Sequence, residues 1–208
     1  MIWVKICGVT GVEDALGCAQ AGADAVGLNF YPGSPRYCRP ETARAIVDAV
    51  AGRATTVGVF VDAGYQEILD LRERVGFDLA QLHGSEPPEL LRRLLPRAFK
   101  ALRLRGASED DRDAALREAM VFGGDFILLD AFVAGLPGGT GRSCDWGLSA
   151  RIARERRVVL AGGLSPHNVA EALARVAPFG VDACSGVERS PGIKDLSLVS
   201  AFVHAAKA

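Results

Sequence analysis

The sequence predicts an α/β protein that folds as a (β/α)8 barrel, the TIM-barrel class. Short apolar runs rich in β-forming residues alternate with stretches of helical spacing along the whole chain. The eight runs start about 25 residues apart, which is the length of one strand, one helix and two short loops. Because strands joined through helices pair in parallel, eight such repeats with a terminal helix close into a barrel.

The predicted strands are short and rich in Val, Ile, Leu and Phe. In chain order they cover Trp3–Cys7, Ala25–Phe30, Thr56–Val61, Asp78–Leu82, Phe99–Leu104, Phe126–Asp130, Val158–Ala161 and Val181–Cys184. Side chains alternate along a strand, so Lys5 and Cys7 share one face of the first strand. We expect that face to point into the barrel.

The predicted helices follow the strands one by one. They cover Val12–Ala21, Pro40–Val50, Gln66–Val75, Glu86–Leu95, Ser108–Met120, Trp146–Arg154, Ser165–Val176 and Leu196–Ala206. Pro40 is favoured at a first helical position, and Ser165 is a good N-cap before Pro166. The first helix carries a stripe of small apolar residues, which is typical of a helix packed closely on a sheet.

An open doubly wound sheet is the alternative, because it uses the same alternation. No linker, low-complexity segment or block of charge divides the chain, so we predict one domain over residues 1–208. That length is short for such a barrel, and most loops must be brief. The longest irregular stretches, Ala131–Asp145 and Tyr31–Arg39, both follow strands, at the face where these barrels hold their active sites.

Composition excludes several classes of function. The chain has 208 residues, with 24 Lys plus Arg against 25 Asp plus Glu, which does not favour a nucleic-acid clamp or a polybasic membrane binder. No apolar stretch is long enough to span a bilayer, and no secretory signal is evident. Five cysteines without a C-x-x-C pair predict reduced thiols in a cytoplasmic protein, and three scattered histidines predict no metal site.

Two glycine-containing turns predict a phosphate site. Gly162 and Gly163 follow the seventh predicted strand, and Ser185 and Gly186 follow the eighth. Glycines let backbone N–H groups approach an anion, and a short helix after Ser185 would direct its N-terminus at the same point. The alternative is that these glycines only permit tight turns.

Cys7 and Asp130 end two strands and are candidates for a base and an acid. A carboxylate that leaves an apolar strand into a partly dry pocket is expected to hold a proton that it can donate. A free thiol is mostly protonated at neutral pH, so Cys7 needs help from the fold to act as a base. Arg36 lies in a turn-rich loop where its guanidinium could hold a planar carboxylate.

A series of motifs makes the sequence recognisable. They are Lys5-Ile6-Cys7-Gly8, Gly27-Leu28-Asn29-Phe30 leading to Ser34-Pro35-Arg36, Gly58-Val59-Phe60, Gln81-Leu82-His83-Gly84, Leu129-Asp130, Gly139-Thr140-Gly141 with Asp145-Trp146, Leu160-Ala161-Gly162-Gly163-Leu164, and Ser185-Gly186-Val187-Glu188 through Pro191-Gly192-Lys194-Asp195. In this order they resemble the phosphoribosylanthranilate isomerase family of tryptophan biosynthesis.

The resemblance implies a cofactor-free Amadori rearrangement of N-(5′-phosphoribosyl)anthranilate to the 1-deoxyribulose 5-phosphate isomer. It implies that Asp130 is the general acid, that Cys7 is the general base and that Arg36 holds the anthranilate carboxylate. The glycine turns would hold the phosphate. His83 and Asp182 match family positions near the pocket, where a substrate-binding role and a hydrogen-bonded core role both remain open.

The sequence departs from the family pattern at three positions. Arg142 and Cys144 replace the usual Lys and Phe of the sixth loop, and Cys184 replaces the more usual Ser. These departures bear on loop packing and on phosphate affinity. They leave Cys7 and Asp130 unchanged.

Two other functions fit the same barrel. A Schiff-base aldolase would use Lys5 or Lys100 as a nucleophilic amine, although Lys5 is better placed to pair with an acid such as Asp182. A non-catalytic sugar-phosphate binding protein would bind without turnover. We expect a small phosphorylated sugar–anthranilate substrate, with no nucleic-acid or membrane partner. The sequence leaves open whether the chain is a monomer or a homodimer and whether it accepts a second, histidine-pathway substrate.

Overall fold

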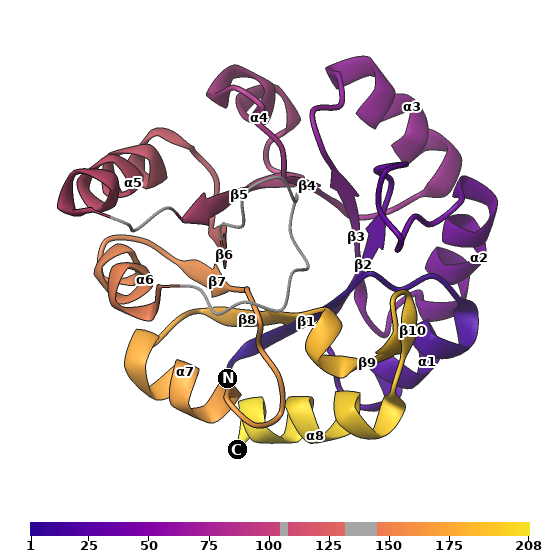
Figure 1. The fold of residues 1–208 in the computed structure, drawn as a ribbon. Helices are drawn as coiled ribbons and strands as arrows, with labels where there is room; N and C mark the ends of the chain where they lie inside the picture. Colours follow the sequence, from indigo (N-terminus) through magenta and orange to yellow (C-terminus); the bar gives the residue numbers. More distant parts are fainter. Residues whose placement is uncertain (105–107, 132–144) are drawn as a thin grey trace.

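A closed parallel barrel forms the centre of the molecule. The computed structural model describes residues 1–104, 108–131 and 145–208, and Figure 1 shows its strands around a central axis with helices outside them. The sheet closes because β8 pairs with β1 in parallel. The barrel strands are β1 (Trp3–Cys7), β2 (Ala25–Asn29), β3 (Thr55–Phe60), β4 (Leu79–Leu82), β5 (Ala98–Leu104), β6 (Ile127–Ala131), β7 (Val158–Leu160) and β8 (Gly180–Ala183). The predicted (β/α)8 TIM barrel is confirmed, and the open doubly wound sheet is wrong.

The helices that the structure describes lie on the outer surface of this barrel. They are α1 (Val12–Gln20), α2 (Pro40–Val50), α3 (Tyr65–Val75), α4 (Pro88–Leu94), α5 (Glu109–Val121), α6 (Trp146–Ala153), α7 (Val169–Val176) and α8 (Leu196–Lys207). None of them is long and apolar enough to cross a membrane. Between β8 and α8 lie a 3₁₀ helix, η1 (Ser185–Val187), and a small antiparallel hairpin of β9 (Glu188–Ser190) and β10 (Ile193–Lys194).

Two helices begin two or more residues later than their sequence pattern predicts. Asn168, rather than Ser165, precedes the first residue of α7, because its side chain closes a turn by accepting from the backbone N–H of Ser165 and donating to the carbonyl of Gly163. Helix α4 begins at Pro88, and Glu86 instead turns inward to pair with Lys100 at 2.7 Å. The β9–β10 hairpin has no counterpart in the sequence prediction.

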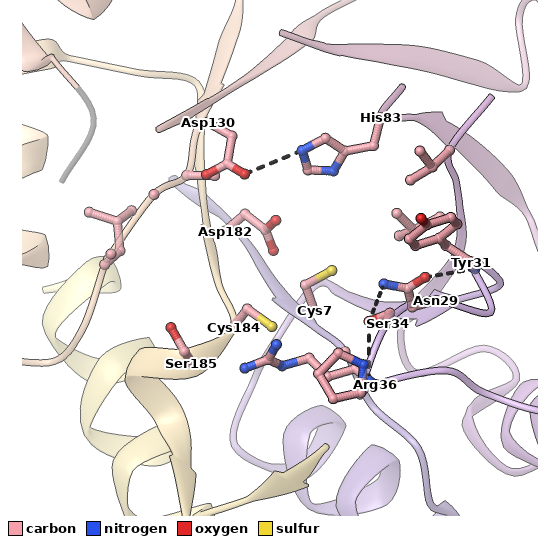
Figure 2. A pocket seen from close by; sticks show the side chains of 18 of the residues that line it. Cys7, Asn29, Tyr31, Ser34, Arg36, His83, Asp130, Asp182, Cys184 and Ser185 are labelled. Atoms are coloured by element: carbon pink, nitrogen blue, oxygen red, sulfur yellow. Dashed lines mark hydrogen bonds and ion pairs between the residues drawn. The ribbon is translucent and has the colours of Figure 1, made fainter. Parts of the chain in front are cut away.

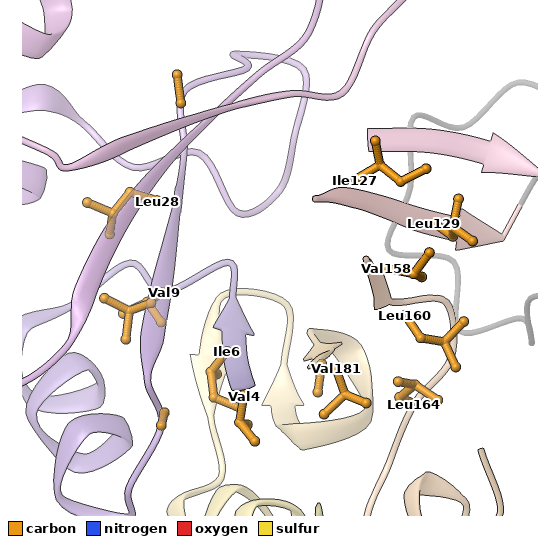
Figure 3. Packing of buried hydrophobic residues seen from close by; sticks show 14 of the residues in the cluster. Val4, Ile6, Val9, Leu28, Ile127, Leu129, Val158, Leu160, Leu164 and Val181 are labelled. Atoms are coloured by element: carbon orange, nitrogen blue, oxygen red, sulfur yellow. The ribbon is translucent and has the colours of Figure 1, made fainter. Parts of the chain in front are cut away.

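The alternation of side chains divides the core into two parts. Residues such as Val4, Ile6, Leu129 and Leu160 point away from the barrel axis and pack beneath the helices (Figure 3). A smaller cluster, which includes Val57 and six other buried residues, fills the barrel interior. Both clusters exclude water from the strands, and this burial is the main favourable contribution to folding.

Aromatic rings close the amino-terminal end of the barrel. The ring of Phe126 lies 5.7 Å from Trp3, 4.7 Å from Phe99 and 5.8 Å from Phe179, measured between centroids. All four residues stand at or next to the start of a strand. Because this end is filled with apolar rings, the polar side chains of the barrel interior gather at the opposite end.

Candidate active site

A cavity of about 240 Å³ opens at the carboxyl ends of the barrel strands. Figure 2 shows side chains from β1, β2, β4, β6 and β8 gathered around this space. The lining includes eight residues that the sequence predicts for the site: Cys7, Arg36, His83, Asp130, Gly162, Gly163, Asp182 and Ser185. The ninth, Gly186, adjoins Ser185 in η1. The predicted site residues therefore converge, although they span most of the chain.

Cys7 is held at the mouth of the barrel by the backbone around it. It ends β1, and its thiol lies so close to β2 that a Cβ on Gly27 would come within 2.8 Å of the sulfur. Fully buried Lys194 donates to the carbonyl oxygen of Cys7 at 2.5 Å. Glycine at position 27 thus makes room for the thiol, and Lys194 fixes the strand end that carries it.

The surroundings of Cys7 favour its thiolate. A hydrogen bond from the thiol of Cys184 is the largest influence and lowers the pKa of Cys7 well below the usual value of a cysteine, while burial opposes this. The ammonium groups of Lys5 and Lys194 lower it further. The same hydrogen bond, together with burial, raises the pKa of Cys184. Of the two thiols, Cys7 therefore loses its proton more readily, and the thiolate is the form that a base requires.

Asp130 lies on β6 and faces His83, which directly follows β4. The Nε2 atom of His83 is 3.2 Å from Oδ2 of Asp130, and the two side chains are 11% and 9% exposed. The other ring nitrogen of His83 lies 2.9 Å from Nε2 of Gln81, which is completely buried. The amide orients the imidazole, and the imidazole in turn lies against the carboxyl group at the cavity wall.

Lys5 and Asp182 form a buried ion pair across the closure between β1 and β8. The Nζ of Lys5 donates to Oδ2 of Asp182 at 2.8 Å. Burial, with the nearby charge of Cys7, raises the pKa of Asp182 to about 7. Burial alone would lower the pKa of Lys5, but the charges of Asp182 and Cys7 outweigh it and raise that pKa. Lys5 is therefore held protonated below the thiol, as the sequence spacing predicts.

Glu188, at the start of β9, fixes Arg36. The Nε of Arg36 donates to both carboxylate oxygens at 2.9 and 3.1 Å, and Nη2 donates to Oε2 at 2.7 Å. Lys194 reaches the same carboxylate at 2.8 Å. These cations outweigh burial and lower the pKa of Glu188. The guanidinium is thus locked in one orientation on the cavity wall. No local sequence pattern indicates these contacts of Glu188 and Lys194, because their partners are distant in the chain or lie across a turn.

The loop after β2 carries Arg36 and is braced by side chains. Asn29 accepts from the backbone N–H of Tyr31 at 2.9 Å and donates to the hydroxyl of Ser34 at 3.1 Å (Figure 2). That hydroxyl also accepts from the backbone N–H of Arg36. These bonds give the loop its shape in the described structure.

The two glycine turns meet at one edge of the cavity. Gly162 and Gly163 have φ values of 87° and 66°, a backbone conformation that other residues rarely adopt. A Cβ on Gly186 would lie 2.1 Å from the carbonyl oxygen of Leu164. The turn after β7 therefore packs directly on η1, and backbone N–H groups can gather around an anion there.

Neither lysine of the Schiff-base alternative is available as a nucleophile. Lys5 is paired as described above. Lys100 is 2% exposed and donates to the carbonyls of Leu82 and Gly84 and to Glu86. Within the described ranges, no group of three or more His, Cys, Asp or Glu side chains could hold a metal ion. Arg142 and Cys144 lie outside the described residues.

Comparison with known proteins gives one consistent result. The sequence pattern of the family described as N-(5′-phosphoribosyl)anthranilate (PRA) isomerase matches residues 4–205. The N-(5′-phosphoribosyl)anthranilate isomerase of Rubrobacter xylanophilus is 47% identical over 210 residues, with all of both chains covered.

Two solved structures share the fold. The crystal structure of phosphoribosyl anthranilate isomerase from Thermotoga maritima has a TM-score of 0.87 and 41% identity, and the match covers 100% of this chain and 99% of the other. A second isomerase, in complex with reduced 1-(o-carboxyphenylamino)-1-deoxyribulose 5-phosphate, has a TM-score of 0.85 and 42% identity over 100% and 99% of the two chains. The chain belongs to the N-(5′-phosphoribosyl)anthranilate isomerase family.

Proposed function

We propose that this chain converts N-(5′-phosphoribosyl)anthranilate into 1-(o-carboxyphenylamino)-1-deoxyribulose 5-phosphate in tryptophan biosynthesis, with Cys7 as general base and Asp130 as general acid. Family membership supports the reaction. The single observation that supports the residue roles is the meeting of a thiolate-favouring cysteine and a buried carboxyl group in one cavity.

The proposed reaction begins at the ribose ring. Asp130 donates a proton to the ring oxygen, the bond from that oxygen to C1′ breaks, and the nitrogen lone pair forms a protonated Schiff base. The Cys7 thiolate then removes the proton from C2′, and the electrons of that bond form a C1′–C2′ double bond. Loss of the C2′ hydroxyl proton and protonation of C1′ give the aminoketose. An acid and a base at fixed positions typically contribute 10²–10⁴-fold each.

The two ends of the substrate carry charges that match the walls of the cavity. Arg36 would hold the anthranilate carboxylate with the N–H groups that Glu188 does not engage. The turns at Gly162-Gly163 and Ser185-Gly186 would hold the phosphate. Held at both ends, the ribose would lie between the acid and the base. The translational and rotational entropy is then lost on binding, before the chemical step, and this lowers the barrier of that step. His83 and Asp182 serve this arrangement as contacts of Asp130 and Lys5.

An activity assay tests the proposal. Purified chain is mixed with enzymatically generated N-(5′-phosphoribosyl)anthranilate, and the fluorescence of the anthranilate group is followed. We expect turnover, and we expect the coding sequence to restore growth of a tryptophan auxotroph that lacks this isomerase. Tight binding without turnover would instead support the non-catalytic binding barrel. The cytoplasmic location stays a prediction, and both a monomer and a homodimer remain compatible with this proposal.

A further inference from the structure

Two cysteines occupy neighbouring positions at the closure of the barrel. In the register of β1 and β8, Ile6 pairs with Ala183; Cys7 is the next residue and ends β1, and Cys184 is the next residue on the other side, between the end of β8 and η1. Neighbouring strands lie about 4.7–4.9 Å apart, which falls within the 4.4–6.8 Å Cα separation of disulfides. Figure 2 shows both sulfur atoms in the same cavity.

The backbone on both sides of this pair is fixed. The Nζ of Lys194 donates to the carbonyl oxygen of Cys7 at 2.5 Å and to that of Cys184 at 3.5 Å. A Cβ on Gly8 would lie 3.0 Å from the sulfur of Cys184, so this sulfur rests against the residue that follows Cys7. One ammonium group therefore holds the backbones of the two cysteines side by side at the mouth of the barrel.

We propose that Cys7 and Cys184 form a reversible disulfide when the protein meets a hydroperoxide, and that this bond switches the isomerase off. The loss of activity rests on the proposed role of Cys7 as base. The bond itself rests only on the placement of the two sulfurs. An attacking thiolate and a neighbouring thiol are the two partners that such a reaction needs.

The oxidation balances without any further reagent. The Cys7 thiolate attacks one oxygen of the hydroperoxide, the O–O bond breaks, and the leaving alkoxide takes up a proton. Cys7 is then a sulfenic acid. The sulfur of Cys184 attacks that sulfur, the S–O bond breaks, and hydroxide leaves with the proton of the Cys184 thiol as water. Two thiols are oxidised by two electrons, and the hydroperoxide is reduced to an alcohol and water.

The other described thiols lack this chemistry. Burial raises the pKa of Cys18 to about 12 and that of Cys38 to about 11, so neither is a thiolate at neutral pH. Both are also buried in the hydrophobic core. They serve as internal controls, because an oxidant reaches these buried thiols only when the protein unfolds. Oxidation of Cys18 or Cys38 would therefore indicate unfolding.

Peptide mapping tests the bond directly. The intact chain is treated with hydrogen peroxide, its remaining thiols are alkylated, and it is digested with trypsin and a glutamate-specific protease. Cleavage after Glu13 separates Cys7 from Cys18. We expect a cross-linked species that joins residues 6–13 to residues 176–188, lighter by two hydrogen atoms than the two free peptides, and alkylated Cys18 and Cys38. Absence of this species while Cys7 carries one to three added oxygen atoms would overturn the proposal.

The Cys184→Ser variant is the matched control, because it removes one sulfur and keeps a hydroxyl in its place. Each protein is compared with its own activity before oxidation. We expect the peroxide-treated wild-type chain to lose activity as the cross-linked species accumulates and to regain it fully with a dithiol reductant. We expect Cys184→Ser to accumulate irreversibly oxidised Cys7 instead. Equal recovery of activity in both proteins after reduction would contradict the proposed disulfide switch.

Failure of the switch and failure of the proposed function are separable. If the cross-link forms but activity persists, Cys7 is not the base, although the disulfide stands. If peroxide forms no cross-link but Cys7→Ala abolishes turnover, the proposed function stands and the switch is wrong. A Cys144→Ser background, in which the fifth thiol is absent, must give the same map.

Discussion

Three buried or half-buried cations surround the thiol of Cys7 and set its chemistry. Lys5 lies below it, Lys194 holds its backbone, and the charge of Arg36 is felt by it as well. Two of these cations have a carboxylate of their own, Asp182 for Lys5 and Glu188 for Arg36. Two carboxylates therefore face three cations, and the remaining positive charge stabilises the thiolate of Cys7. At Cys18, on a helix stripe, burial outweighs the charge of Lys194 and raises the pKa of the thiol to about 12.

Replacement of the acid and of the base should separate chemistry from binding. We expect Cys7→Ala and Asp130→Asn each to lower kcat by at least roughly 100-fold, because each removes one proton transfer. Steady-state kinetics with the fluorescent substrate measure this. Both variants should still bind a phosphorylated product analogue. Near-normal turnover by either one would refute its assigned role.

The pH dependence of alkylation reports the thiolate of Cys7. The thiolate is the reactive form, so the rate rises with pH and levels off above the pKa of the folded protein. Because that pKa is lowered, we expect the rise to occur well below the value of about 8.5 of a free cysteine. Iodoacetamide inactivation rates at a series of pH values measure it. A midpoint at or above the free-cysteine value would contradict the environment described here.

At the scale of elements, the short 3₁₀ helix η1 and the β9–β10 hairpin after β8 shape two walls of the site. The η1 helix packs on the turn after β7, and the β9–β10 hairpin supplies both Glu188 and Lys194. The turn and η1 form the predicted phosphate edge, and the hairpin fixes the orientation of Arg36. In the proposed function, these elements would set the distance between the groups that hold the two ends of the substrate.

Loss of the Glu188 charge should affect binding and stability together. We expect Glu188→Gln to raise KM more than it lowers kcat, because Arg36 loses its fixed orientation. We also expect a loss of about 3 kcal/mol in the free energy of unfolding, as for a broken buried pair. Glu171→Gln, which removes an exposed i,i+4 pair with Arg175, is the control and should change neither quantity. Unchanged KM in Glu188→Gln would disprove the positioning role.

A methyl group at the contact between the two turns should disturb the phosphate edge. In Gly186→Ala the new Cβ would meet the carbonyl oxygen of Leu164 at 2.1 Å, so the turns must separate. We expect a higher KM for substrate and weaker competitive inhibition by inorganic phosphate. Gly123→Ala, where the nearest atom would be 3.5 Å away, serves as the control. Equal phosphate inhibition in wild type and Gly186→Ala would count against this edge as the phosphate site.

At the scale of the whole molecule, the closure between β1 and β8 joins the first strand to the last. Four register pairs hold it, and the ion pair of Lys5 and Asp182 lies within it. The barrel interior is otherwise apolar at this level, with Val57, Leu128 and Val159 completely buried. A charge pair at the closure is therefore sensitive to the loss of either member.

Removal of Lys5 should extend the pH dependence of stability above pH 7. Without the ammonium group, the pKa of Asp182, already raised from 3.8 to about 7, rises further. The folded state then binds the proton more tightly than the unfolded chain, so stability falls as pH rises from about 4 through 7 and beyond. We expect Lys5→Met to lose more Tm relative to wild type at about pH 8 than at about pH 5. A deficit that is equal at both pH values would refute this linkage.

Most features that depend on neighbouring residues in the sequence were predicted correctly. Strand alternation correctly directed Lys5 and Cys7 into the barrel, and repeat length predicted the closed sheet. Partners distant in sequence have no such signal. Lys194 contacts Cys7 across 187 positions, and neither spacing nor hydrophobic period indicates that pairing. The start of α7 was misplaced because Ser165 has the chemistry of an N-cap while the side chain of Asn168 closes the turn.

Lys194 also sets an order of events during synthesis. A ribosome releases the strand that carries Cys7 long before the hairpin that carries Lys194, and a domain generally folds as a unit. Until residue 194 leaves the exit tunnel, the carbonyl of Cys7 lacks its ammonium partner. In the proposed function, Cys7 would therefore become competent to remove a proton only after this last segment has been made.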